Sequence, residues 1–211
     1  MTGTGTIPLS ETQRLSLLAM FGTLWALAEL QLGNQLHWAR VPFAGLVLTA
    51  CGVFVLVSAR MFVPRLGSAV AVGLVVAAIK AVLGGPGGQW AAIGILAESS
   101  AIELVFLTGP LSPGRAAVAG GAAMIWSFFH PFLVQGLVAG LGVLRIYGLI
   151  LKKAAAVFGL GTDRPWILLA ALFGLHVLFG AASGAVGWRL SVRISRTVPL
   201  STPRVQAVRE G

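Results

Sequence analysis

The chain has 211 residues, of which 57% are hydrophobic and 10% are charged, and its formal net charge is +9. A soluble domain carries about 25% charged residues, so this composition excludes an ordinary soluble enzyme or binding module and indicates an integral membrane protein. The basic residues stand at the ends of apolar runs, where they act as topology signals and contact lipid headgroups. The positive charge therefore does not predict a nucleic-acid partner.

Six apolar runs come close to the length of about 20 residues that a helix needs to cross a bilayer. They cover residues 15–32, 42–59, 67–83, 90–108, 116–131 and 166–188. The sequence therefore predicts an all-α, polytopic membrane protein, a six-helix transmembrane bundle with a single domain at 15–188. A polar N-terminal tail at 1–14, without the basic region of a signal peptide, and a basic C-terminal tail at 189–211 would flank it.

The spans carry recognisable helix signals. Ser10 or Thr12 could cap the first span, and the Gly22-xxx-Ala26 spacing within it would let another helix approach closely. Pro131 lacks a backbone donor, so we expect it to kink or end the fifth span.

The segment 135–158 differs from these spans because Arg145, Lys152 and Lys153 interrupt its apolar residues. It could form a seventh span, a re-entrant piece or an amphipathic helix at the membrane interface. We favour the interfacial interpretation.

The distribution of basic residues predicts the orientation in the membrane. With six spans, both chain ends lie on the same side. That side holds Arg14, Arg60, Arg65, Arg115, Arg189, Arg193 and Arg196, and the opposite side holds Arg40, Lys152, Lys153 and Arg164. The positive-inside bias then places both termini in the cytoplasm, for a multi-pass protein of the cell (inner) membrane.

Ionisable and aromatic residues collect in the outer half of the predicted bundle. A charged side chain in the hydrocarbon region costs about 2.5 kcal/mol or more, so such residues usually face the bundle interior or a cavity and mark function. The residues concerned are Glu29, His37, Trp38, Lys80, Trp90, Glu98 and His130. Glu103, the second carboxylate of the fourth span, falls in the inner half.

One ion pair is the most specific expectation. Gly73, Ala77, Lys80 and Gly84 share one helix face, so the lysine should point into a packed bundle. A glycine-rich loop connects its span to the span of Glu98. We expect Lys80 and Glu98 to pair across this helix hairpin, either to hold the two helices together or to form part of a binding site.

The other members of the cluster have ordinary interpretations beside the functional one. Trp38 and Trp90 could be interfacial belt residues, and Glu29 could be solvated near the headgroups. His130 could bond a carbonyl that Pro131 frees. Their clustering is stronger evidence for a site than any single residue.

Several motifs are absent from the sequence. There is no GxxxxGK[ST], GxSxG or HExxH, so nothing predicts nucleotide hydrolysis, serine hydrolysis or zinc proteolysis. Asp163 is the only aspartate, which disfavours paired-aspartate metal chemistry on lipid pyrophosphates. We therefore expect a chain that is not an enzyme and that needs no cofactor and no metal.

Three segments resemble one known family. They are LGNQLHWARVPFAG after the first span, GILAESSAIELVF in the fourth span and WSFFHPF at the end of the fifth. With six spans in about 200 residues, residues 15–188 resemble the substrate-binding S component of energy-coupling factor (ECF) transporters, which take up vitamins. The resemblance implies a small-molecule nutrient bound near the outer face, a transmembrane T component and cytoplasmic ATPases as partners.

The same resemblance points to particular residues. Ligand contacts in that family come from the first loop, expected here at 33–42, and from the outer ends of spans four to six. The substrate-binding candidates are Asn34, Trp38, Lys80, Trp90, Glu98 and His130. Family members dock to the T component through an AxxxA motif on the first helix; here Ala19-xxx-Thr23 and Gly22-xxx-Ala26 stand in its place. Nickel and cobalt members carry a histidine after the initiator methionine, where this chain has Thr2, which disfavours a metal substrate.

Two other classes of function remain open from the sequence. The chain could be a structural subunit of a larger membrane complex, with its charges serving helix packing. It could also be a membrane enzyme that acts on lipid, with Glu98 and His130 as acid and base.

Overall fold

The computed structural model describes residues 9–138, 140 and 142–197, and within them every regular element is a helix. The helices are α1 (Glu11–Trp38), α2 (Ala44–Phe62), α3 (Ser68–Leu83), α4 (Gly88–Leu107), α5 (Pro113–Pro131), the π-helix η1 (Phe132–Val138), α6 (Val143–Phe158) and α7 (Pro165–Thr197). Helices α1, α2, α4, α5 and α7 are long and apolar enough to cross a membrane, and α3 is a shorter apolar helix. The predicted all-α membrane bundle is confirmed.

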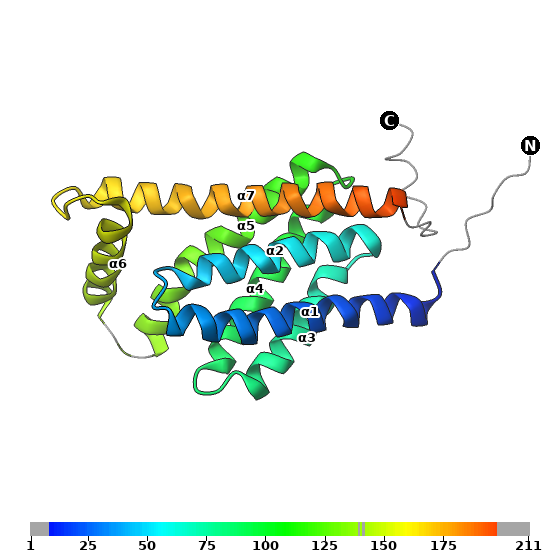
Figure 1. Cartoon of the computed structure of the whole chain (residues 1–211), viewed down its shortest axis with the longest axis horizontal. Helices are drawn as coiled ribbons and strands as arrows, with labels where there is room; N and C mark the ends of the chain where they lie inside the picture. Colours follow the sequence, from blue (N-terminus) through cyan, green and yellow to red (C-terminus); the bar gives the residue numbers. More distant parts are fainter. Residues whose placement is uncertain (1–8, 139, 141, 198–211) are drawn as a thin grey trace, which may run out of the picture.

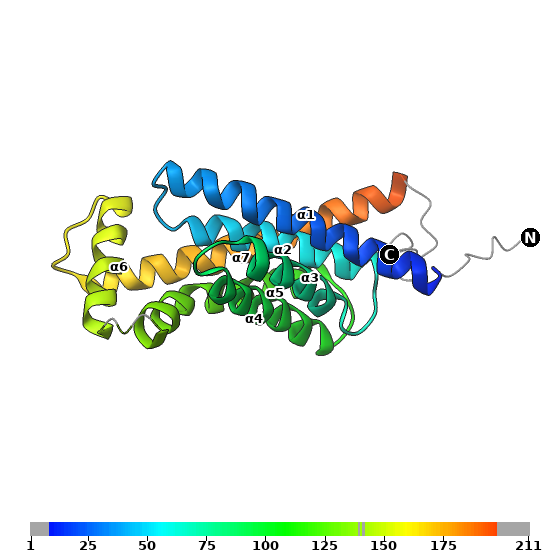
Figure 2. The same cartoon turned by 90° about the horizontal axis from the view of Figure 1, so that it is seen from below.

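Helices α1 to α5 and α7 run side by side, and α6 lies across one end of them (Figures 1 and 2). The start of α1 and the end of α7 lie together at the opposite end, which we call the terminal end; we call the other the α6 end. Helix α5 packs on α7 and α4, α3 packs on α4 and α1, and α2 packs on α1, α5 and α7. Each α-helical hairpin therefore brings its turn to one of these two ends.

Small residues set the closest helix contacts. A Cβ atom on Gly120 of α5 would collide with the backbone of Gly180 on α7, and one on Gly184 would collide with the backbone of Ala116. In α1, a Cβ on Gly22 would lie 2.8 Å from Val75 of α3. The predicted close approach at Gly22-xxx-Ala26 is thus present, and both residues are buried inside this chain.

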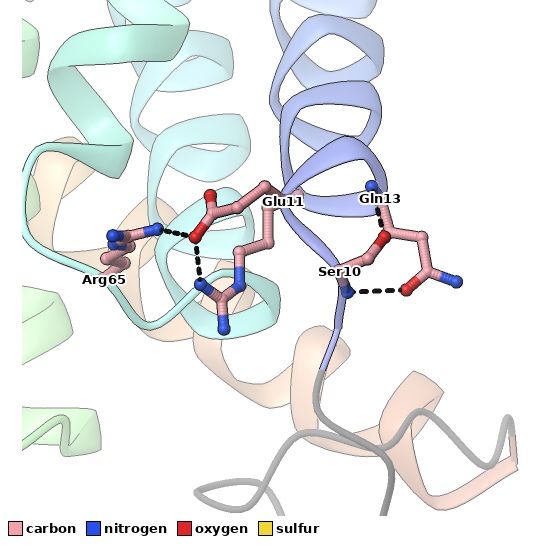
Figure 3. A network of polar contacts seen from close by, with 5 residues as sticks. Ser10, Glu11, Gln13 and Arg65 are labelled. Atoms are coloured by element: carbon pink, nitrogen blue, oxygen red, sulfur yellow. Dashed lines mark hydrogen bonds and ion pairs between the residues drawn. The ribbon is translucent and has the colours of Figure 1, made fainter.

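The start of α1 is capped as expected and is tied to the next hairpin (Figure 3). Ser10 Oγ accepts from the backbone N–H of Gln13 at 3.2 Å, and Gln13 Oε1 accepts from the N–H of Ser10 at 2.9 Å, which makes a reciprocal capping box. Beside the cap, Glu11 accepts hydrogen bonds from Arg65 and Arg14. This network joins α1 to the α2–α3 turn.

Helices α1, α2 and α7 end later than the predicted spans. Helix α1 continues through 33–38, where a loop was predicted, because Gly33 alone does not end a helix and the next proline comes only at position 42. Helix α2 continues to Phe62. Helix α7 continues to Thr197, so the first part of the expected basic tail is helical. A helix does not stop where its residues stop being apolar, and the span prediction used only apolarity.

The expected effect of Pro131 is confirmed. Helix α5 ends at this residue, whose missing N–H removes an i→i−4 hydrogen bond, and the backbone continues as the π-helix η1. Helix α6 follows as a separate 16-residue helix that is not among the apolar helices long enough to span. It lies across the end of the bundle and does not run alongside the other helices (Figures 1 and 2).

Candidate functional site

A buried carboxylate in the middle of the bundle is the centre of the candidate site. Glu98 of α4 is buried, and its Oε1 accepts a hydrogen bond from Thr49 Oγ1 of α2 at 2.8 Å. The same hydroxyl lies 3.0 Å from Ser127 Oγ of α5. Three helices thus contribute to one short chain of polar groups. Among the described residues no cation and no backbone N–H hydrogen-bonds to Glu98.

His130 of α5 lies about one turn from this group of polar side chains and contacts α4. Its Nε2 lies 3.2 Å from the carbonyl oxygen of Trp90, and because a carbonyl only accepts, Nε2 carries the proton in this contact. A Cβ on Gly94 would lie 3.0 Å from the same nitrogen, so only glycine leaves this room for the ring. Trp90, Gly94 and Glu98 follow at spacings of four on α4 and so form one stripe.

Polar residues of α5 lie beside the stripe on α4, because the two antiparallel helices are in register there. Ser127 precedes His130 by three residues on α5, and the contacts place Ser127 beside the Glu98 group and His130 beside Gly94. At 1.5 Å per residue, the two levels are about 4.5 Å apart along α5 and about 6 Å apart along α4. The α4–α5 seam therefore presents a carboxylate, a hydroxyl and an imidazole over a short distance, and α2 adds the Thr49 hydroxyl.

The expected pair between Lys80 and Glu98 is corrected by the structure. Lys80 Nζ lies 3.2 Å from Glu29 Oε2 and 3.2 Å from the Glu29 carbonyl oxygen, so the lysine of α3 pairs with α1. Helix α3 packs on both α1 and α4. The helical period predicts that Lys80 lies on an inward face of α3, but it does not predict whether this face meets α1 or α4. Glu29, expected at the outer end of its span, is buried in this pair.

The candidate residues at the end of α1 lie apart from the site. Trp38 is 86% exposed at the last residue of α1, and Asn34 is exposed one turn earlier. The side chain of His37 lies outside the described part of the chain. The structure therefore brings together Trp90, Glu98 and His130, places Lys80 in a separate pair, and leaves Asn34 and Trp38 at the surface of the α6 end.

Sequence reasoning missed the hydroxyl partners and a second buried ion pair. Arg60 Nε lies 3.4 Å from Glu103 Oε1, and Glu103 Oε2 accepts from the backbone N–H of Ala69 at 2.9 Å. This pair joins α2, α3 and α4 near the terminal end. Thr49 and Ser127 could have been found as hydroxyls within apolar runs at the depth of Glu98. Arg60 lies one residue beyond the predicted second span, which ends at 59, whereas α2 continues to Phe62.

His176 belongs to an aromatic cluster. Its Nδ1 lies 2.8 Å from the carbonyl oxygen of Leu172 one turn earlier, and its ring packs edge-on against Phe128 and Phe43. These contacts agree with a packing role. A cavity of about 290 Å³ lies nearby at the α6–α7 turn, where it is lined by Leu160, Gly161, Asp163, Arg164, Ile167 and Leu168. None of its lining residues belongs to the polar stripe.

The four residues of the expected docking motif divide between two faces of α1. Gly22 and Ala26 are buried inside the bundle, whereas Ala19 and Thr23 are exposed. Thr23 Oγ1 donates to the carbonyl oxygen of Ala19 at 2.9 Å, so its hydroxyl is satisfied within the helix. A small, apolar free surface remains at these two positions.

The fold and the site together define a class: a multi-pass helical membrane protein with a buried, hydrogen-bonded carboxylate between three helices. Within the described residues, no group of three or more His, Cys, Asp or Glu side chains is placed to hold a metal ion. No family model, curated protein or solved structure matches the chain. The chemistry of the site is therefore the argument for function.

Proposed function

We propose that this chain is a membrane-embedded substrate-capture subunit of a nutrient transporter, similar to the S component of ECF systems, and that it holds its ligand against the α4–α5 seam. The ligand would be a small molecule whose polar edge carries N–H donors or a positive charge. The observation that supports this most is the environment of Glu98.

A buried carboxylate needs compensation, because an ionised group in a low-dielectric interior costs several kcal/mol, on the order of 5, unless it is paired. Among the described residues, the other two buried carboxylates have cationic partners: Glu29 has Lys80, and Glu103 has Arg60. Glu98 has one hydroxyl donor. A ligand with N–H donors would complete its hydrogen bonding, and a charge-assisted bond of this kind is about twice as strong as a neutral one.

The rest of the stripe fits a flat heteroaromatic ligand. His130 and Trp90 stand at the α6 side of Glu98, and aromatic faces pack well on planar rings. Ser127 adds a hydroxyl that can donate or accept beside the carboxylate. Such a site would reject analogues that lack the matching donors, because its own buried groups would then remain unpaired.

Partners and orientation follow from the same proposal. The transporter would include a transmembrane T-type subunit and cytoplasmic ATPases, and the exposed Ala19 and Thr23 on α1 offer a small surface for helix docking. Both termini would be cytoplasmic in the cell membrane, with the α6 end outside. The ligand would then enter from the α6 end.

The test is direct ligand identification on the purified full chain. Native mass spectrometry should find a bound small molecule, and adding that molecule to ligand-free protein should change tryptophan fluorescence. Glu98→Gln should weaken binding at least about tenfold, a loss of roughly 1.4 kcal/mol, since one charge-assisted hydrogen bond contributes about that much. Ser100→Ala is the matched control: it is two residues further on α4, so it lies on the other side of the helix, and its binding should stay at the wild-type value.

If no vitamin or precursor binds and no ATPase co-purifies, the capture proposal fails. The structural-subunit alternative would then be favoured, because the Lys80–Glu29 and Arg60–Glu103 pairs both join neighbouring helices and would need no ligand. The lipid-enzyme alternative has less support: Glu98 and His130 bond to Thr49 and Trp90, and no described hydrogen bond connects the two.

A further inference from the structure

Helix α6 carries a basic face that no acidic residue in the described part of the chain neutralises. Arg145, Lys152 and Lys153 are exposed, and their spacing of seven and eight residues places them on one side of the helix. The helix contains no aspartate or glutamate. None of the ion pairs or hydrogen bonds among the described residues involves these three side chains, and the nearest aspartate in the sequence, Asp163, pairs with Arg164 at 3.8 Å.

The opposite face of α6 attaches the helix to the bundle. Leu151 and Ala154 are buried against Leu168 and Leu172 of α7, and Tyr147 packs on the same cluster. The position of α6 is therefore fixed by contacts with α7. Its basic face points away from these contacts because it lies on the other side of the helix.

The direction and depth of α6 match the edge of a bilayer. In both views it runs across the direction of the membrane-spanning helices, at their end (Figures 1 and 2). Two exposed tryptophans lie at the same end of the bundle. Trp38 is the last residue of α1 and is 86% exposed, and Trp166 is the second residue of α7 and is 77% exposed. Exposed tryptophans at helix ends mark the headgroup level of a membrane. Leu144 of α6, at 85% exposure, adds an apolar side chain that can enter the acyl layer.

We propose that α6 is a lipid-binding helix that lies in the membrane interface and selects anionic phospholipid headgroups through Arg145, Lys152 and Lys153. The three cations meet the phosphate and the additional negative charge of such a lipid, while the opposite face of the helix stays on α7. A zwitterionic headgroup offers no net charge to balance them. This lipid site is separate from the α4–α5 seam and does not depend on the capture proposal.

The experiment measures which lipids surround α6. The full chain with Cys51→Ala and Leu149→Cys carries a fluorescent label at position 149, which is exposed on the basic side of α6. The labelled protein is reconstituted in phosphatidylcholine vesicles that contain either phosphatidylglycerol or phosphatidylcholine with a nitroxide near the top of the acyl chain. Quenching by the phosphatidylglycerol probe should indicate a local enrichment on the order of tenfold, and high salt should reduce it.

Two triple variants separate a local lipid site from general charge. Arg145→Gln with Lys152→Gln and Lys153→Gln should abolish the preference for phosphatidylglycerol. Arg189→Gln with Arg193→Gln and Arg196→Gln removes the same charge from exposed positions at the terminal end and should leave it unchanged.

Three results would overturn the proposal. Equal quenching by both probes would show that α6 does not select anionic lipid. An unchanged preference in the α6 variant would show that its basic residues are not the cause. Absence of quenching by either probe would show that the basic face of α6 does not lie in the membrane interface.

Discussion

Replacing Lys80 with methionine should strongly destabilise the bundle, and the damage should depend on Glu29. In the folded chain the ammonium lies 3.2 Å from both the carboxylate and the main-chain carbonyl of Glu29. The side chains of Lys80 and Glu29 are 15% and 9% exposed, so water does little to replace the lost partner. Removing one member of a buried ion pair costs about 3–5 kcal/mol because the other charge is left uncompensated.

The assay is thermal unfolding of purified variants in detergent, followed by the loss of the monodisperse peak. For a chain of this size the expected loss corresponds to a fall in Tm on the order of 10 °C. Glu29→Gln should cost a similar amount, whereas the double change Lys80→Met with Glu29→Leu should recover most of the stability, because an apolar pair replaces the ion pair.

The decisive comparison uses Glu98. The changes Lys80→Met and Glu98→Gln should be additive, since the lysine bonds to Glu29 and the Glu98 carboxylate bonds to Thr49. A large coupling between Lys80 and Glu98, with none between Lys80 and Glu29, would refute the assignment of the pair and would restore the hairpin pairing expected from the sequence.

Three further predictions concern packing, the second ion pair and topology. Gly120→Ala should separate α5 from α7 and cost about 1–3 kcal/mol, because its Cβ would collide with Gly180, whereas Gly174→Ala on α7 meets open space and should be neutral or slightly stabilising in the same melting assay. Glu103→Gln and Arg60→Met should each lower Tm by more than the combined variant does, and a combined loss equal to the sum of the two would contradict a coupled pair. A reporter fused after the last residue should be active only when its enzyme works in the cytoplasm; activity of a periplasmic reporter there would invert the proposed orientation.

The positions of most spans could be predicted from the sequence because apolarity and length decide which segments can cross a bilayer. The third and fourth spans differ from α3 and α4 by at most two residues at either end. The extents of α1 and α7 were wrong because a helix can continue through polar residues. No proline interrupts the chain between Gly33 and Trp38, and Arg189 lies on a helix that was already formed.

The candidate site was only partly predictable, for a similar physical reason. The helical period places Trp90 and Glu98 on one stripe, and chain direction places His130 at a comparable depth. Neither quantity tells which helix lies opposite a given face. The order of helices around the bundle comes from packing of small residues such as Gly22 against α3, and this order decides that Lys80 meets Glu29 rather than Glu98.

The length of α7 and the arginines at its end limit how far this helix can move across the membrane. Its 33 residues extend about 50 Å at 1.5 Å per residue, against a hydrocarbon layer of about 30 Å. Arg189, Arg193 and Arg196 occupy its last turns, and drawing them into the hydrocarbon would cost roughly 2.5–3.5 kcal/mol for each side chain. They therefore act as a stop that prevents the helix from sliding towards the α6 end. Helix α5 packs closely on α7 at Gly120, so the two helices keep the same depth in the membrane. The arginines of α7 therefore also fix the depth of Ser127 and His130 on α5.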